Sequence, residues 1–307
     1  MLPFTASGGV DFDGLAGHVR RTAAAGIVPA VNMDTGYGHL LDNATRRRVL
    51  EIAREAAGPA AGQPFGGLVA GAWVVDEAGA AFDADSYTTQ LAMISDAGAT
   101  PVIFPSWGLN TGEDQDVLAR LRLLSERTPQ FLGFELATAF HPAGRVLSLA
   151  AYQGLMEIPN CLGAKHSSLS RRLEWDRLAL RNRVRPDFHV FTGNDLAIDM
   201  VRYGSDWLLG LSTAWPEAFA LRDRWWTEGD RRFDELDDCL QALGDFAFRW
   251  PVPAYKHSMA QFLTLRGLIG CDATHPNSLP RPSHDREVLA GLRDRIEAAM
   301  NATPAGP

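Results

Sequence analysis

The chain contains only two lysines, Lys165 and Lys256, although it has many arginines. The residues that lead into Lys165, starting at Cys161, are apolar or weakly polar and predict a short buried strand that carries the lysine near its C-terminal end. Burial lowers the pKa of a lysine because a low dielectric disfavours the ammonium. A neutral lysine amine can attack a carbonyl and form a Schiff base, which an arginine cannot do. Lys165 is therefore a candidate nucleophile, and a surface lysine just past a strand end is the alternative.

Composition restricts the class of protein. A length of 307 residues with 46% hydrophobic residues suits one large α/β barrel or two ordinary domains. The net charge of −8 argues against nucleic acid or an anionic membrane as the main partner. No apolar run approaches the roughly 20 residues that span a bilayer, and no secretory signal is recognisable. We therefore expect a soluble, cytoplasmic protein.

The cysteines and the acidic residues give no indication of a metal site. Cys161, Cys239 and Cys271 are far apart, odd in number and without metal-ligand spacing, which suggests a reducing compartment. No paired His, Asp or Glu motif has ligand spacing either.

Short apolar segments alternate with amphipathic ones over the first two thirds of the chain. The eight expected strands are 1–4, 27–33, 68–75, 100–104, 131–136, 161–165, 189–192 and 207–211. The helices expected between them are 11–25, 43–57 with Asn43 as its N-cap, 85–97, 114–127, 148–156, 172–181 and 195–203. Short strands that are apolar on both faces predict a parallel sheet closed into a (β/α)8 TIM barrel.

The remainder of the chain is expected to be all-helical. The amphipathic segments are 216–228, 231–248, 253–268 and 286–300, followed by a frayed tail over 301–307. We therefore predict a barrel domain over residues 1–214 and a C-terminal helical extension over 215–307, packed on the barrel.

Five short motifs occur in order along the chain. They are Leu2-Pro3-Phe4 with Gly9-Val10-Asp11, Asp34-Thr35-Gly36-Tyr37, Gly163-Ala164-Lys165, Gly193-Asn194-Asp195 and Gly204-Ser205-Asp206. In this order and spacing the sequence resembles the dihydrodipicolinate synthase / N-acetylneuraminate lyase superfamily of class I aldolases along nearly its whole length. The resemblance implies a Schiff base on Lys165, no cofactor, a small carbonyl substrate and a homo-oligomer, a dimer or commonly a tetramer.

Two positions depart from the family pattern. The proton-relay tyrosine of the family would fall at Ala137, which cannot move a proton. Counting along the strand, we expect Glu135 on the same face as that position and near Lys165, as a candidate general base. A structural carboxylate paired with an arginine is the equal alternative, and His141 and Tyr37 are lesser candidates.

The second departure lies in the expected carboxylate pocket. The loop that would hold the carboxylate of a 2-oxo acid has Asp34 in place of a hydroxyl residue, so that only Thr35 and Gly36 remain as donors. An aspartate beside a carboxylate is unfavourable unless it is protonated or bound elsewhere, which argues against pyruvate. Further wall residues are expected at strand ends: Trp107, Leu209 and Leu211.

The sequence thus predicts a Schiff-base-forming lyase or aldolase acting on a 2-oxo acid or related carbonyl compound. A sugar-acid dehydratase using the same iminium is an alternative. The other alternative is a barrel without its proton relay that binds or regulates, which Ala137 favours and the retention of Lys165 disfavours.

Overall fold

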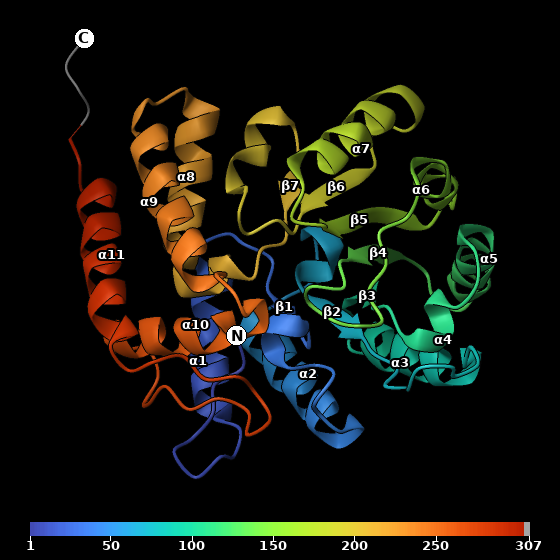
Figure 1. Cartoon of the computed structure of the whole chain (residues 1–307), viewed down its shortest axis with the longest axis horizontal. Coiled ribbons are helices and arrows are strands. Elements are labelled where there is room, and N and C mark those ends of the chain that lie inside the picture. The colour runs from blue at the N-terminus through green and yellow to red at the C-terminus, as the bar shows by residue number, and fades with distance from the viewer. Residues whose placement is uncertain (304–307) are drawn as a thin grey trace.

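The computed structural model describes residues 1–303; residues 304–307, the end of the expected frayed tail, lie outside the described part. Its centre is one curled parallel sheet whose strands follow one another in chain order (Figure 1). The strands are β1 Ala30–Val31, β2 Val69–Ala72, β3 Thr100–Ile103, β4 Phe131–Leu136, β5 Cys161–Ser167, β6 His189–Thr192 and β7 Asp206–Trp207.

Helices follow most of the strands, as expected for a β/α repeat. Those of the sheet region are α1 Phe12–Ala24, α2 Asn43–Ala57, α3 Ala84–Asp96, α4 Trp107–Asn110, α5 Asp114–Ser125, α6 Leu149–Met156 and α7 Arg171–Val184. The C-terminal ones are α8 Pro216–Glu228, α9 Arg232–Ala247, α10 Tyr255–Leu265 and α11 Asp285–Met300. Short 3-10 helices follow β1 at Asp34–Gly36 and β6 at Ile198–Tyr203, where a longer helix was expected.

Aspartate side chains cap the N-termini of the first three long helices. Asp11, Asp42 and Asp83 each accept a hydrogen bond from a backbone N–H in the first turn of the following helix. Such a bond satisfies one of the N–H groups that have no partner inside the helix. For α2 the capping residue is Asp42 and not Asn43, because the chain enters the helix one residue earlier than the sequence suggested.

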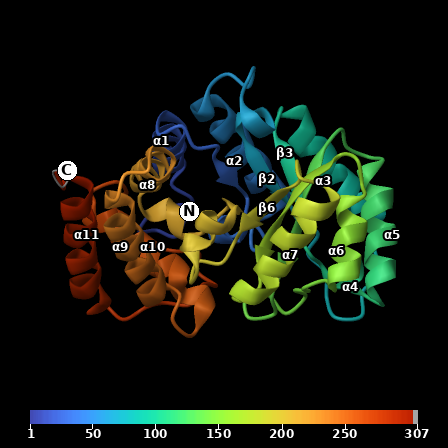
Figure 2. The same cartoon turned by 90° about the horizontal axis from the view of Figure 1, so that it is seen from above.

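The inner face of the sheet carries a compact apolar cluster. Its buried members are Met33, Val69, Trp73, Val102, Phe104, Leu132 and Phe191. Helices α3, α6 and α7 cover the outer face (Figure 2). Because both faces of the sheet are covered, its strands are apolar on both sides, which is typical of parallel sheets in barrels.

Helices α8–α11 form a second apolar cluster beside the sheet (Figure 1). The cluster also includes Leu209, Leu211 and Ala214, which follow β7. These shared contacts fit an extension packed on the barrel, and the boundary at residue 214 stays a prediction.

The expected first strand is wrong. Among the described residues, Phe4 makes only an isolated antiparallel bridge to Val10, and the sheet contains seven strands, β1 to β7. The expected last strand is also shorter, since β7 ends at Trp207 and a 3-10 helix occupies Leu211–Ala214. The sheet therefore curls like a barrel but has two free edges, at β1 and at β7.

No helix within residues 1–303 is both long and apolar enough to cross a membrane.

Candidate functional site

Lys165 lies on the inner face of the sheet. In the ladder it is flanked by Phe134 of β4 and Phe191 of β6. Its side chain is 8% exposed, and its Nζ lies 4.8 Å from the centre of the Phe134 ring. It lines a cavity of about 460 Å³ together with Leu132 and Phe191 of the inner apolar cluster. A lysine amine is thus presented to a largely apolar cavity.

The surroundings of Lys165 lower its pKa below the usual lysine value. Burial is the largest cause, because it disfavours the ammonium, and the negative charges of Asp195 and Asp34 oppose it without cancelling it. A larger fraction of neutral, nucleophilic amine at neutral pH follows from this balance.

Gly193 leaves the space that the Lys165 side chain occupies. It follows β6, and a Cβ at this position would collide with Cε of Lys165 and with the hydroxyl of Ser167. Residue 193 must therefore be glycine for Lys165 to keep its present conformation.

Asp195 is the carboxylic acid whose negative charge has the largest effect on the pKa of Lys165. It is buried, and its Oδ1 accepts a hydrogen bond of 2.7 Å from the N–H of Leu211. Burial raises its pKa to about 7, and the neighbouring Lys165 works in the opposite direction. Asp195 can therefore exchange a proton near neutral pH, which a general acid or base must do.

Asp34 forms a buried ion pair with the second lysine of the chain. The Nζ of Lys256, on α10, lies 3.1 Å from the Asp34 carboxylate. Burial is the largest single influence on Asp34 and opposes its ionisation, but Lys256 and His39, with the hydroxyl of Tyr255, outweigh it and lower its pKa. Asp34 is thus an ionised carboxylate whose charge is matched within the protein.

Tyr255 links Asp34 to Thr35. Its hydroxyl donates to Asp34 Oδ2 at 2.9 Å and is 2.7 Å from the hydroxyl of Thr35. Because the single phenol proton is given to Asp34, Thr35 donates to Tyr255. Thr35 and Gly36 both line the cavity, although the N–H of Gly36 is bonded to Met33 within the turn.

A series of aromatic rings leads from Lys165 to two histidines, His39 and His141. The Phe134 ring meets Phe104 edge to face, and Phe104 stacks on Trp73 with centroids 3.8 Å apart. His39 and His141 contact Trp73. Burial is the largest cause that lowers the pKa of His39, to about 4, so that this ring is neutral at pH 7.

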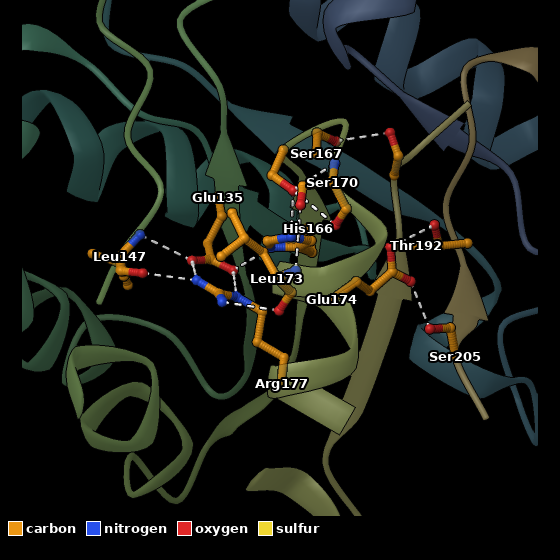
Figure 3. Close-up of polar contacts among 12 residues, drawn as sticks. Glu135, Leu147, His166, Ser167, Ser170, Leu173, Glu174, Arg177, Thr192 and Ser205 are labelled. Carbon is orange, nitrogen blue, oxygen red and sulfur yellow. Dashed lines mark hydrogen bonds and ion pairs between the residues drawn. The ribbon is translucent and has the colours of Figure 1, made fainter. Parts of the chain in front are cut away.

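Glu135 lies on the opposite face of β4, so the expected position beside Lys165 is wrong. It pairs in the ladder with His166, and its carboxylate makes two hydrogen bonds of 2.6 Å with Arg177 of α7. It also accepts from His166 Nδ1 and from the N–H of Leu147 (Figure 3). Burial opposes its ionisation, but Arg177 and His166 together lower its pKa. The structural alternative, a carboxylate paired with an arginine, is therefore the one observed.

The Glu135 network extends to Ser168, whose hydroxyl lies 2.6 Å from His166 Nε2. The order serine, histidine, acid is that of a hydrolase triad. Here, however, the Ser168 hydroxyl is also bonded to both backbone groups of Ser170, and it does not line the Lys165 cavity. In the same layer Glu174 accepts from Thr192 and Ser205 (Figure 3). These contacts join β4, β5 and β6 to α7.

The three remaining expected wall residues have different surroundings. Leu209 lines the Lys165 cavity. Leu211 is fully buried among the C-terminal helices and contributes its N–H to Asp195. Trp107 begins α4 with its N–H on Asp76, and it lines a separate hollow with Asn110 and Arg145. Trp107 is therefore not part of the Lys165 cavity.

Within residues 1–303, no group of three or more His, Cys, Asp or Glu side chains is arranged to hold a metal ion.

Solved structures share this fold over nearly the full chain. A putative dihydrodipicolinate synthetase from Pseudomonas aeruginosa has a TM-score of 0.78 at 18% identity, covering 96% of this chain and 97% of that chain. A prophage protein of the dihydrodipicolinic acid synthase family from E. coli K12, in complex with pyruvate, has a TM-score of 0.80 at 16% identity, covering 96% and 95%. An N-acetylneuraminate lyase from Mycoplasma synoviae has a TM-score of 0.71 at 16% identity, covering 97% and 95%.

The sequence itself matches none of the family models and none of the curated proteins compared with it. The structural likenesses show that the chain shares the α/β barrel fold of these dihydrodipicolinate synthase and N-acetylneuraminate lyase structures. The resemblance inferred from the five sequence motifs is confirmed at the level of the fold.

Proposed function

We propose that this protein is a Schiff-base-forming carbon–carbon lyase or aldolase that acts on a 2-oxo acid or a related carbonyl compound. The observation that carries the proposal is a buried lysine amine of lowered pKa: Lys165 lies near the C-terminal end of β5 and lines a cavity inside the sheet.

In the proposed reaction the neutral Lys165 amine adds to the substrate carbonyl, and the adduct loses water to give an iminium. The iminium accepts the electron pair of the carbon–carbon bond that breaks in the cleavage direction, while a proton leaves the hydroxyl of the departing aldehyde fragment. The resulting enamine takes up a proton, and water releases the 2-oxo acid and the free amine. No cofactor besides the lysine is required.

Asp195 is the group we propose for these proton transfers. Its raised pKa of about 7 and its electrostatic coupling to Lys165 support this role. Glu135, our expectation from the sequence, is held on the helix side of the sheet by Arg177.

The Asp34–Lys256 ion pair removes the objection to a carboxylate substrate. A bound carboxylate meets an aspartate whose charge is already matched, instead of an uncompensated anion. The Thr35 hydroxyl lines the cavity, and Lys256 belongs to the same hydrogen-bonded group, so both support carboxylate binding here. A 2-oxo acid such as pyruvate is therefore our proposed carbonyl partner.

Two properties of the protein in the cell complete the proposal. By resemblance to the family we propose a homo-oligomer, a dimer or tetramer, in the cytoplasm. Light scattering at several concentrations tests the first of these.

Turnover with a panel of 4-hydroxy-2-oxo acids tests the function. We expect release of a 2-oxo acid and an aldehyde in equal amounts by the wild type, and none by Lys165→Arg. A 2-oxo product formed by loss of water without an aldehyde fragment would indicate the dehydratase. No turnover on any substrate, with ligand binding unaffected by Lys165→Arg, would contradict the enzyme and favour a binding protein.

A further inference from the structure

The cavity that Lys165 lines is much larger than the proposed reaction needs for pyruvate. Its volume of about 460 Å³ lies within the range of about 300–1,000 Å³ that is usual for pockets holding drug-sized ligands. Pyruvate is far smaller than such ligands. Lys165 and Thr35, which we propose to hold the 2-oxo acid, line one end of the cavity. The rest of the cavity can therefore bind a further part of the substrate.

From the lysine the cavity continues between β1 and β7. Residues 27–33 line it on the side of β1, and residues 205–210 line it on the side of β7. We call this part of the cavity the β1–β7 passage. Its apolar side chains are buried or half-buried and include Val28, Ala30, Leu208 and Leu209. The walls on both sides of the passage are therefore suited to an apolar ligand.

The far end of the passage lies between α1 and α8, which are side by side (Figure 2). Leu15, Val19 and Thr22 line it from α1, and Trp226 and Thr227 line it from α8. Leu15 and Val19 are buried, whereas Trp226 is 46% exposed and borders the solvent. The cavity thus leads from the buried amine to the surface of the molecule along a mostly apolar path.

Most polar side chains along this path are already bonded within the protein. Four hydroxyls that line the cavity donate to protein oxygens, namely those of Thr22, Ser205, Ser212 and Thr227. The indole of Trp207 donates to Asp223 at 2.6 Å. Among the lining residues, all of which lie in the described part of the chain, Asn32 Oδ1 is the only buried side-chain nitrogen or oxygen without a partner. A chain with several hydroxyls would lose its hydration here without gaining matching partners, which is unfavourable.

We propose that the substrate is a 4-hydroxy-2-oxo acid whose chain beyond the hydroxyl is an alkyl chain, and that the β1–β7 passage binds this chain. The inference rests on the proposed function, because the imine with Lys165 fixes the 2-oxo acid at one end of the cavity. The bond that breaks joins the carbon next to the carbonyl to the carbon that bears the hydroxyl. Its electron pair moves to the iminium, the hydroxyl proton leaves, and the products are pyruvate and an apolar aldehyde.

Binding of unbranched 2-oxo acids of increasing length tests the proposal. The dissociation constants of 2-oxobutanoate, 2-oxohexanoate and 2-oxooctanoate are measured by calorimetry on the wild type. A fully buried methylene lowers Kd by about fourfold, and we expect a fall of at least tenfold from 2-oxobutanoate to 2-oxooctanoate. A Kd that does not fall with length would overturn the proposal. So would tighter binding of 3-deoxy-2-oxogluconate than of 2-oxohexanoate, since the two have equal length and only the first has hydroxyls.

Variants of the passage locate the alkyl chain. Ala30→Phe places a ring between β1 and β7, and we expect the ratio of Kd for 2-oxobutanoate to Kd for 2-oxooctanoate to fall towards one. Ala56→Phe is the matched control, because Ala56 of α2 is also half-buried but lies outside the cavity, and it should keep the ratio of the wild type. If Ala30→Phe does not fold, Leu208→Trp narrows the passage from the other side. An unchanged ratio in the folded passage variant would place the chain elsewhere and overturn the proposal.

Imine trapping separates failure of this inference from failure of the proposed function. A borohydride-trapped pyruvate adduct on Lys165, together with a Kd that does not fall with chain length, would retain the lyase and overturn the alkyl substrate. A Kd that falls with chain length in the wild type and not in Ala30→Phe, without any adduct on Lys165, would retain the passage as a binding site for apolar 2-oxo acids and contradict the lyase.

Discussion

At the scale of single residues, Asp195 distinguishes this site from a lysine in an apolar cavity alone. Its pKa of about 7 arises from burial, and Lys165 holds it from rising further. We expect Asp195→Asn to leave imine formation measurable and to lower turnover by roughly 10²–10⁴-fold, as is typical for loss of a general acid or base. Stopped-flow trapping and steady-state rates measure the two effects separately.

The pH profile gives a second test of Asp195. Its basic form accumulates as the pH rises through about 7, so a limb of kcat/KM against pH, which reports on the free enzyme, should lie there in the wild type. The limb should be absent in Asp195→Asn. A wild-type limb that persists unchanged in the variant would assign the titration to another group.

Glu135 should contribute to stability and not to chemistry. Removing one partner of a buried ion pair costs about 3–5 kcal/mol, because the other charge is left unpaired. We therefore expect Glu135→Gln to lower the free energy of unfolding in urea by about that amount while the folded fraction still forms the imine. Replacing both partners, as Glu135→Leu with Arg177→Met, should recover part of the loss.

The stabilisation by Glu135 should depend on pH in one direction. Its folded-state pKa is lowered, so the contribution is present above the unfolded pKa of Glu and is lost as the pH falls through that value towards the folded one. A Glu135→Gln variant that matched the wild type in stability at pH 7 would contradict the ion-pair account.

At the scale of elements, the Asp34–Lys256 ion pair joins α10 to the loop after β1. Lys256→Met should raise KM for 2-oxo acids, because Asp34 loses the ammonium that matches its charge. The ratio of KM to that of the wild type should be larger at pH 8 than at pH 5.5, since protonated Asp34 no longer repels a carboxylate. The double variant Asp34→Asn with Lys256→Met should restore KM, and failure to do so would show a direct role for Lys256.

The turn after β6 positions Lys165 through Gly193. We expect Gly193→Ala to slow imine formation markedly, since its Cβ would occupy the place of Lys165 Cε. Gly291→Ala is a matched control in α11, where a Cβ meets nothing within 4 Å. That change should raise stability by about 0.5–1 kcal/mol and leave the imine rate unaltered.

The elements themselves were largely predictable from sequence, because each β/α unit has its own apolar period and caps. The site was harder to predict from the sequence than the elements were. Glu135 was assigned by counting back from Ala137, but the strand ends at Leu136, and parity does not hold beyond a strand end. The Asp34–Lys256 pair joins residues far apart in the chain, and no local sequence pattern predicts it. Trp73 and Asp195 were within expected strands and motifs but had no spacing that marks a role.

At the scale of the whole molecule, the sheet and the C-terminal helices share apolar contacts through the segment after β7. If they unfold together, Leu240→Ala in the core of α9 should lower the stability of the entire chain by about 2–5 kcal/mol. A single transition by circular dichroism that coincides with loss of imine formation is the expected result. Two separate transitions would instead show that residues 215–307 are an independent unit.

The most direct test of the account is to locate a borohydride-trapped adduct in the chain. The protein is incubated with pyruvate and borohydride and then digested, and its peptides are weighed; with only two lysines, each lies on its own peptide. We predict the mass increment of the reduced pyruvate imine on the peptide that contains Lys165, and its loss in Lys165→Arg. An increment on the Lys256 peptide or on the N-terminal amine, or one that persists in Lys165→Arg, would contradict the assignment of Lys165 as the nucleophile.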